Sequence, residues 1–242
     1  MALNISKLKS LASKKPPVCT AVIAAAGTSQ RCKGEDKLFY QVRGKPVLAY
    51  TIEAFQKCPL ISEIIIVARQ EHFDSIGEIC IQYGYDKVTK IIKGAPTRAE
   101  SVIGGVFAVS GKTKLIAIHD GARPCIGIET IEKTINAAAK YHAAAPATKI
   151  ISTVKRVDNN MITETVDREG LYEIQTPQVF RTEIIKAALT NAAKKSISVT
   201  DDCMAAEMIG LRPYIVEGSR SNIKITENED LQRAETILSG RI

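Results

Sequence analysis

Short, almost continuous apolar runs alternate with segments of helical periodicity along the first two-thirds of the chain. The apolar runs predict buried strands at residues 19–25, 63–68, 87–92 and 114–118. Helices are predicted at residues 46–55, 73–81, 97–109 and 128–141, the third with a capping box formed by Thr97 and Glu100. Apolar strands that alternate with helices are typical of a mostly parallel sheet covered on both faces.

The pattern changes after residue 147. Two short strands around Asp158-Asn159-Asn160 predict a β-hairpin over residues 149–166, which we expect to protrude as an arm. Further helices are predicted at residues 181–193, 201–209 and 227–238, and further strands at 213–216 and 222–225. Thr200 or Asp201 is expected to cap the helix at 201–209. No repeat or linker divides the chain, so we expect an N-terminal extension (1–17) and a single domain (18–242).

Composition narrows the classes of partner. Of the 242 residues, 45% are hydrophobic, and the formal net charge is +7. The Lys and Arg residues are dispersed and only 5% of residues are aromatic, whereas a nucleic-acid-binding face is typically a basic cluster with stacking rings. The excess of positive charge therefore favours small polyanions such as phosphates. No apolar stretch of about 18 residues and no signal-peptide pattern is present, so we expect no membrane partner.

The six cysteines include no C-x-x-C pair, which makes a zinc site or a dithiol redox site an unfavoured interpretation. Several of them lie in apolar runs, where cysteine behaves as a small hydrophobic residue. We therefore expect a reducing, cytoplasmic environment.

Ligands of parallel α/β sheets bind beyond the carboxyl ends of the strands, so the residues that follow each strand are candidates for ligand contacts. The first strand is followed by the small-residue turn Ala25-Ala26-Gly27, whose backbone N–H groups can cradle phosphate oxygens. Arg31 and Lys37 add two cations to this segment. The alternative interpretation is an ordinary strand-to-helix loop with solvated charges.

The fourth strand is followed by His119-Asp120-Gly121-Ala122-Arg123. The Asp120 carboxylate can hold a ribose hydroxyl or a metal, and Arg123 offers bidentate hydrogen bonds to a phosphate. His119 is more typical of a hydrogen-bonded histidine near the core, because no Ser or Cys nucleophile accompanies it.

Seven motifs follow one another in a single order along the chain. They are A-A-G-x(3)-R-x(5)-K, R-A-E-S-V, H-D-G-A-R-P, V-D-R-x-G-L, T-P-Q-x-F, T-D-D and N-I-K-I-T. This order, from about Thr20 to Leu238, closely resembles the 2-C-methyl-D-erythritol 4-phosphate cytidylyltransferase family. The resemblance implies a Rossmann-like, three-layer nucleotidyltransferase fold with a mostly parallel sheet and a β-hairpin arm. It also implies a homodimer in which each arm completes the active site of the other subunit.

The resemblance also implies roles for individual residues. Arg31 and Lys37 match the cations that stabilise charge on the α-phosphate, and Arg168 and Lys224 match the residues that position the attacking phosphate. The implied substrate-binding residues are Ala25, Ala26, Gly27, Ser101, Asp120, Arg123, Thr153, Thr176 and Thr200. Among these, Ser101 would touch cytosine and Asp120 the ribose or the acceptor. The resemblance also implies that the methylerythritol phosphate site is lined by Arg123, Thr153 and Thr176, together with Arg168.

The chemistry of the residues agrees with this resemblance. A phosphate monoester is mostly dianionic at neutral pH and needs no side-chain base to act as a nucleophile. The reaction instead needs in-line positioning and cancellation of phosphate charge by Arg, Lys and Mg²⁺. We expect Mg²⁺ to be bound mainly through the phosphates of CTP, with no dedicated protein ligands.

The sequence departs from the family pattern in two loops. The segment 31–37 lacks the proline that often precedes the family's lysine, so Lys33 is an alternative to Lys37. The turn Lys93-Gly94-Ala95-Pro96 replaces a Gly-Gly pattern, and Pro96 removes a backbone donor near the expected cytosine site. A ribitol-5-phosphate cytidylyltransferase and a non-catalytic nucleotide-binding domain are the alternative functions, and the residues at 25–27 and 119–122 favour methylerythritol.

Overall fold

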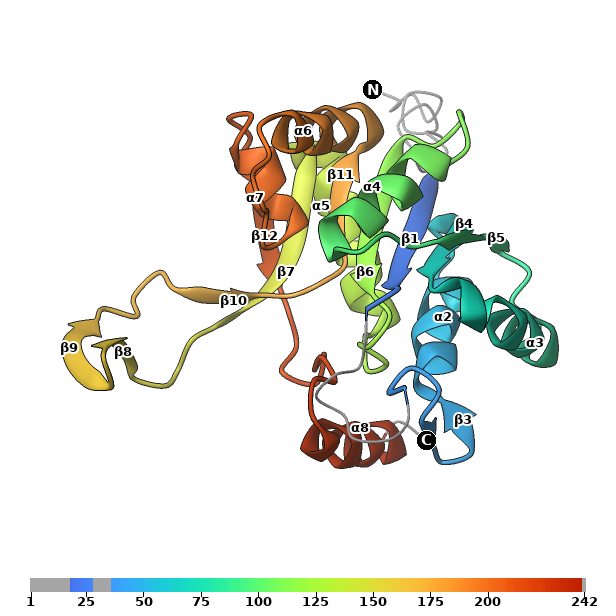
Figure 1. The fold of residues 1–242 in the computed structure, drawn as a ribbon, viewed down its shortest axis with the longest axis horizontal. Coiled ribbons are helices and arrows are strands. Elements are labelled where there is room, and N and C mark those ends of the chain that lie inside the picture. The colour runs from blue at the N-terminus through green and yellow to red at the C-terminus, as the bar shows by residue number, and fades with distance from the viewer. Residues whose placement is uncertain (1–17, 28–35, 241–242) are drawn as a thin grey trace, which may run out of the picture.

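The main sheet lies at the centre of the computed structural model, which describes residues 18–27 and 36–240. Within these residues the strands follow the order β10-β7-β11-β6-β1-β4-β5, with β12 paired to β7 (Figure 1). The parallel part consists of β1 (Cys19–Ala25), β4 (Ile61–Ala68), β5 (Val88–Lys93) and β6 (Leu115–Asp120). The remainder consists of β7 (Ala143–Lys149), β10 (Tyr172–Ile174), β11 (Gln178–Arg181) and β12 (Tyr214–Glu217). The predicted mostly parallel sheet is confirmed, and β11 runs antiparallel between β6 and β7.

Two aliphatic clusters cover the opposite faces of the sheet and make three layers. One cluster contains residues of α2 (Val47–Lys57), α3 (Phe73–Tyr83), α5 (Ile128–Tyr141) and α8 (Asn228–Ser239). The other contains residues of α4 (Arg98–Ala108), α6 (Thr182–Lys194) and α7 (Asp202–Glu207). Successive residues of β1 alternate between the clusters, with Ala21 and Ile23 in the first and Val22 in the second. This alternation explains the unbroken apolar strand, because both of its faces are buried.

The strand predicted at residues 222–225 does not form. The backbone groups of this segment bond to loops and to side chains: Ile225 N donates to Ala122 O, and Asn222 O accepts from Arg123. The pattern did not predict β7, β10 or β11. The segment of β7 is rich in alanine and contains Pro146, and the other two strands are short, so none carries a clear period. A small hairpin of β2 (Gln41–Val42) and β3 (Lys45–Pro46) and a 3₁₀ turn, Gln70–His72, were also unpredicted.

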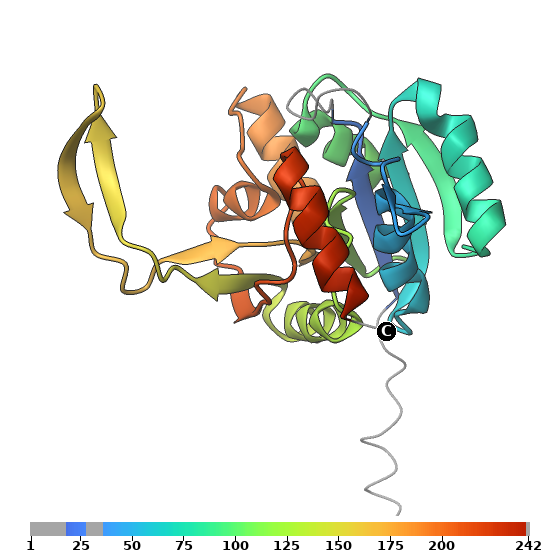
Figure 2. The same ribbon diagram turned by 90° about the horizontal axis from the view of Figure 1, so that it is seen from below.

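A second hairpin stands apart from the main sheet. Strands β8 (Val154–Asp158) and β9 (Met161–Val166) pair with each other in antiparallel fashion, and neither pairs with a strand of the main sheet. Figure 2 shows them extending away from the body of the molecule. Their connection places Asn159 and Asn160 at positive φ, a conformation that asparagine tolerates. The apolar side chains of Ile151, Val157, Met161 and Ile162 are exposed on or beside this hairpin.

The described residues bear on the expectations about cysteines, membrane-spanning helices and metal sites. The cysteines of the described segments, Cys19, Cys58, Cys80, Cys125 and Cys203, are free thiols, and Cys32 lies outside these segments. Among residues 18–27 and 36–240, no helix has both the length and the apolar character that a membrane crossing requires. The same residues contain no group of three or more His, Cys, Asp or Glu side chains placed to hold a metal ion.

Candidate active site

A cavity of about 270 Å³ opens where the carboxyl ends of β1 and β6 meet the loop after β5. We call it the nucleotide cavity. Seven of the predicted site residues line it: Ala25, Ala26, Gly27, Lys37, Ser101, Asp120 and Lys224. Ala95, Pro96, Thr97, Arg98 and Thr226 also contribute to its wall. Sequence positions as far apart as Ala25 and Thr226 thus converge at one edge of the sheet, as the strand-end rule predicts.

The loop after β5 packs tightly against the turn after β1. A Cβ atom at Gly94 would lie 2.2 Å from the Cβ of Ala26, so glycine is the residue that permits this approach. The Ser101 hydroxyl accepts a hydrogen bond from Ala95 N at 2.9 Å and donates one to Ala95 O at 3.1 Å. Ser101 therefore holds the loop that carries Pro96, and its predicted contact with cytosine stays a prediction.

Replacing Gly94 with alanine is expected to raise the KM for CTP by about tenfold, because the new methyl group would push apart the two loops that form the nucleotide cavity. Steady-state kinetics at a saturating acceptor concentration measure this effect. Gly77→Ala is the matched control, since a Cβ at Gly77 meets no atom within 4 Å. An unchanged KM for CTP in the Gly94 variant would show that this close approach does not shape the nucleotide site.

Asp120 is the electrostatic centre of the site. Its Oδ1 accepts from Arg98 Nε at 3.1 Å, and its Oδ2 lies 3.0 Å from Lys224 Nζ and 3.4 Å from Arg123 Nε. Burial alone would raise the pKa of Asp120, but these three cations together hold it well below its usual range. The carboxylate is therefore ionised at neutral pH and is surrounded by positive charge.

Arg98 is a site residue that the sequence interpretation missed. Its guanidinium bonds to Asp120 and also to Asp202, a fully buried carboxylate at the start of α7. Arg98 is the first residue of α4, directly after the cap Thr97, whose predicted capping box with Glu100 is confirmed. A cation in the first turn of a helix is unfavourable with respect to the helix dipole. That misplaced charge was the available sequence signal that Arg98 is held by carboxylates elsewhere.

Lys37 reaches the nucleotide cavity from the loop that precedes β2. It is half-buried, and its Nζ donates to Ile225 O at 2.8 Å. The neighbouring Asp36 forms an ion pair with Arg69, which follows β4, at 2.6 Å. These contacts tie the end of the loop to the sheet and to the 222–226 segment. Arg31 and the alternative Lys33 lie outside the described residues.

His119 and Thr176 are buried next to Asp120. His119 is fully buried and burial lowers its pKa to about 3, so it is neutral at ordinary pH, in agreement with a near-core histidine. Thr176 Oγ1 lies 2.9 Å from His119 Nδ1 and accepts from Asp120 N at 3.2 Å. Thr176 lines neither the nucleotide cavity nor the cavity beside it, and its predicted contact with the acceptor stays a prediction. Its hydroxyl positions the end of β6.

A second cavity of about 580 Å³ adjoins the first, and we call it the acceptor cavity. The two share Lys224 and Thr226 as lining residues. Arg123, predicted to line the acceptor site, contributes to the acceptor cavity while its Nη1 donates to Asn222 O at 2.7 Å. The lining also includes the cationic residues Lys149, Arg220 and Arg233.

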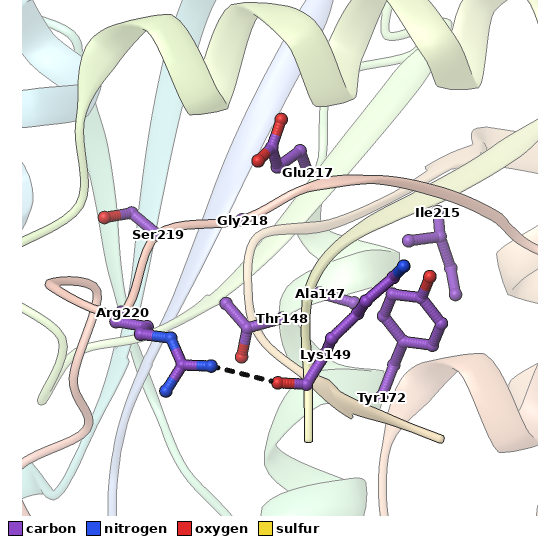
Figure 3. A pocket seen from close by; sticks show the side chains of 9 residues that line it. All are labelled: Ala147, Thr148, Lys149, Tyr172, Ile215, Glu217, Gly218, Ser219 and Arg220. Carbon is purple, nitrogen blue, oxygen red and sulfur yellow. Dashed lines mark hydrogen bonds between the residues drawn. The ribbon is translucent and has the colours of Figure 1, made fainter. Parts of the chain in front are cut away.

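A third cavity, of about 670 Å³, lies at the base of the hairpin (Figure 3). It shares Thr148, Lys149 and Arg220 with the acceptor cavity. Arg220 points toward Lys149 and donates to its carbonyl oxygen at 3.2 Å, as the dashed line in Figure 3 marks. This contact joins the loop after β12 to the end of β7, where the chain leaves the sheet for the hairpin.

Three predicted site residues line neither the nucleotide cavity nor the acceptor cavity. Thr153 directly precedes β8 and Arg168 follows β9, so both flank the base of the hairpin, and both are exposed. Arg168 donates to the carbonyl oxygen of Ile151. Thr200 is exposed next to α7, whose cap is Asp201 rather than Thr200. Within one chain, Thr153 follows Ser152 and Arg168 bonds to Ile151, and both of these neighbours line the acceptor cavity.

The fold and the site define a class of protein. In this three-layer α/β fold, two adjoining cavities lined by cations lie at the carboxyl ends of the parallel strands and are suited to phosphates. This arrangement is that of a nucleotidyltransferase. The sequence model of the 2-C-methyl-D-erythritol 4-phosphate cytidylyltransferase family (IspD) matches residues 19–240. The chain belongs to this family.

Individual relatives agree with the family match. A 2-C-methyl-D-erythritol 4-phosphate cytidylyltransferase of Clostridium acetobutylicum is 42% identical over 90% of this chain and 96% of its own length. That of Halalkalibacterium halodurans is 38% identical over 92% and 97%. Among solved structures, a 4-diphosphocytidyl-2C-methyl-D-erythritol synthase from Anaerococcus prevotii superposes with a TM-score of 0.82 at 34% identity, covering 93% of this chain and 97% of that one.

Proposed function

We propose that this protein transfers a cytidylyl group from CTP to 2-C-methyl-D-erythritol 4-phosphate in the non-mevalonate isoprenoid pathway. The observation that carries the proposal is the junction of the nucleotide and acceptor cavities at Lys224 and Thr226. Two phosphate-bearing substrates in these cavities would present their phosphates to each other at this junction. The family of the chain supplies the identities of the two substrates.

The reaction requires no side-chain nucleophile. A phosphate oxygen of the acceptor attacks the α-phosphorus of CTP, and the bond from that phosphorus to the bridging oxygen breaks. The electron pair leaves with pyrophosphate, and the product is CDP-methylerythritol. In-line displacement of this kind is accelerated mainly by positioning and by cations near the developing charge.

The roles of the site residues follow from their places in the proposal. The backbones of Ala25, Ala26 and Gly27 cradle the triphosphate of CTP. Lys37, together with Arg31, stabilises the negative charge that develops at the α-phosphate. Lys224 holds the attacking phosphate at the junction of the two cavities.

Mg²⁺ fits the site through the nucleotide rather than through a protein cage. Among residues 18–27 and 36–240, Asp120 is the one carboxylate that lines the nucleotide cavity, and its oxygens are already engaged by Arg98, Arg123 and Lys224. Mg²⁺ commonly keeps several waters and binds substrate phosphates with few protein ligands. When bound, it supplies charge neutralisation on the phosphates of CTP.

A product assay tests the function directly. The protein is incubated with CTP and Mg²⁺ plus either 2-C-methyl-D-erythritol 4-phosphate or ribitol 5-phosphate, and pyrophosphate release is followed. We expect release with the methylerythritol acceptor. Release with ribitol 5-phosphate alone would identify the other cytidylyltransferase activity, and no release with either acceptor would favour a non-catalytic nucleotide-binding domain.

We also propose a homodimer in which the hairpin of one subunit completes the acceptor cavity of the other. The exposure of Thr153 and Arg168 at the ends of the hairpin supports this proposal, as do the exposed apolar side chains of Met161 and Ile162. In such a dimer Arg168 would bind the acceptor phosphate in the partner's cavity. Residues 18–242 would form the single nucleotidyltransferase domain of each subunit, and the free thiols support a cytoplasmic location.

Arg168→Ala is expected to raise the KM for the acceptor by about tenfold or more, because a charged hydrogen-bonding partner of its phosphate is lost. Mixed dimers provide the decisive measurement. If the arm acts across the interface, co-expression of Arg168→Ala with Lys37→Ala subunits restores activity, since one intact composite site forms. Activity that stays at the level of the separate variants would contradict sharing of the site between subunits.

A further inference from the structure

Arg98 joins two carboxylates that belong to different parts of the fold. Its Nε donates to Asp120 Oδ1 at 3.1 Å, while Nη1 and Nη2 donate to the two oxygens of Asp202 at 3.4 and 3.0 Å. All three guanidinium nitrogens are thus engaged. We call Asp202, Arg98 and Asp120 the carboxylate–arginine relay.

The far end of the relay is rigidly placed. The side chain of Asp202 is completely buried, and the backbone amides of Asp202 and Cys203 both donate to Gln178 Oε1 at 2.9 Å. Arg98 itself follows the capping box of α4, which fixes the first turn of that helix. Since both of its anchors are fixed, the guanidinium keeps its place beside Asp120.

Asp120, at the near end of the relay, competes with the phosphate of the acceptor for Lys224. Lys224 Nζ lies 3.0 Å from Asp120 Oδ2, yet the side chain is 40% exposed and lines both cavities. Arg123 Nε is a longer contact of the same oxygen, at 3.4 Å. A phosphate of the acceptor that binds Lys224 would share its ammonium with Asp120 and so weaken the ion pair between Lys224 and Asp120. A buried carboxylate that loses a cation is strongly destabilised unless other charges remain beside it.

We propose that Arg98, held by Asp202, is a positioning residue that keeps the charge of Asp120 compensated, so that Lys224 can exchange Asp120 for the phosphate of the acceptor. Arg98 acts through Asp120 and Lys224. The inference rests on the proposed cytidylyltransferase function. It states that the relay sets the affinity of the enzyme for its anionic acceptor. Without Arg98, Asp120 retains Lys224 more strongly, and the phosphate of the acceptor loses its cation.

Kinetics of Arg98→Gln provide the first test. The KM for 2-C-methyl-D-erythritol 4-phosphate is expected to rise by about tenfold or more, while the KM for CTP changes by less than about threefold. Arg98→Lys keeps the charge but cannot reach both carboxylates, so an intermediate KM for the acceptor is expected. Arg212→Gln, an exposed arginine that lines none of the three cavities, is the matched control.

A double-mutant cycle separates the relay from a merely structural role. In an Asp120→Asn background no carboxylate charge retains Lys224, so the further change Arg98→Gln is expected to alter the KM for the acceptor by less than about twofold. The thermal unfolding midpoint of each variant shows whether it is folded at the assay temperature. A full effect of Arg98→Gln in the Asp120→Asn background would overturn the proposal.

Two other outcomes would also overturn the proposal. A rise confined to the KM for CTP would mean that Arg98 contacts the nucleotide itself. A lowered unfolding midpoint with both KM values unchanged would mean that the relay only stabilises the fold. Failure of the relay is distinguishable from failure of the proposed function, because the latter appears as absence of product with the wild-type protein.

Discussion

Lys37→Ala is expected to lower kcat by about 100- to 1,000-fold, with a much smaller change in the KM for CTP. Lys37 lines the nucleotide cavity, and its Nζ is oriented by a hydrogen bond to Ile225 O at 2.8 Å. A cation placed beside the α-phosphate interacts more strongly as charge develops in the transition state than it does with bound CTP, so its loss appears mainly in kcat. Single-turnover measurements with saturating CTP and acceptor report this chemical step.

Lys87→Ala is the matched control for Lys37→Ala. Lys87 Nζ also donates to a carbonyl oxygen, that of Cys58, at 2.8 Å, but it lines neither the nucleotide nor the acceptor cavity. It therefore reports the effect of deleting a lysine that bonds to the backbone. A change confined to the KM for CTP in Lys37→Ala would show that Lys37 binds the nucleotide without stabilising the transition state, and Lys33 would then be the next candidate.

Lys224→Gln is expected to lower kcat/KM for the acceptor by at least about 100-fold. Glutamine can still hydrogen-bond to Asp120, but it carries no charge for the attacking phosphate at the junction of the two cavities. Charge-assisted contacts and correct placement of the nucleophile both contribute to this loss. Steady-state kinetics with varied acceptor at saturating CTP measure the effect.

Lys133→Gln serves as the control for Lys224→Gln. Lys133 forms an exposed ion pair with Glu129 on α5, at 2.7 Å, and exposed pairs of this kind contribute little. Equal and small effects of the two substitutions on kcat/KM would exclude Lys224 from the positioning of the acceptor. A loss restricted to the KM for CTP would place Lys224 at the nucleotide instead.

Sequence patterns predicted those elements whose signals are local. The helix predicted at residues 128–141 coincides with α5, and the capping box at Thr97 and Glu100 marks the start of α4. The strands of the parallel core were predicted within one or two residues. Strands β1, β4 and β6 are apolar runs that are mostly buried on both faces, whereas the edge strand β5 was predicted although none of its residues is buried. The strands β7, β10 and β11 were not predicted, because pairing with their neighbours, rather than their composition, makes them strands.

Sequence signals likewise predicted some residues of the candidate site and missed others. The strand-end rule and the ordered motifs identified the turn at 25–27, Asp120 and Lys224, which the fold brings to one cavity. They also placed Thr176 in the acceptor site, which stays a prediction; the structure shows its hydroxyl bonded to His119 and to Asp120 N. They also assigned no role to Arg98, although R-A-E-S-V was one of the recognised motifs.

The sequence by itself determined the three-layer class of fold, the cationic character of the site and the family, since periodicity, charge and motif order are properties of the chain alone. The tertiary structure alone decided how the charges pair. Arg98 and Asp202 are 104 residues apart in sequence, and Asp120 gathers Arg98, Arg123 and Lys224 around one carboxylate. The reason is physical: the strength of an ion pair depends on distance and burial, and for these residues both are set by the packing of α4, α7 and the 222–226 segment against the end of β6.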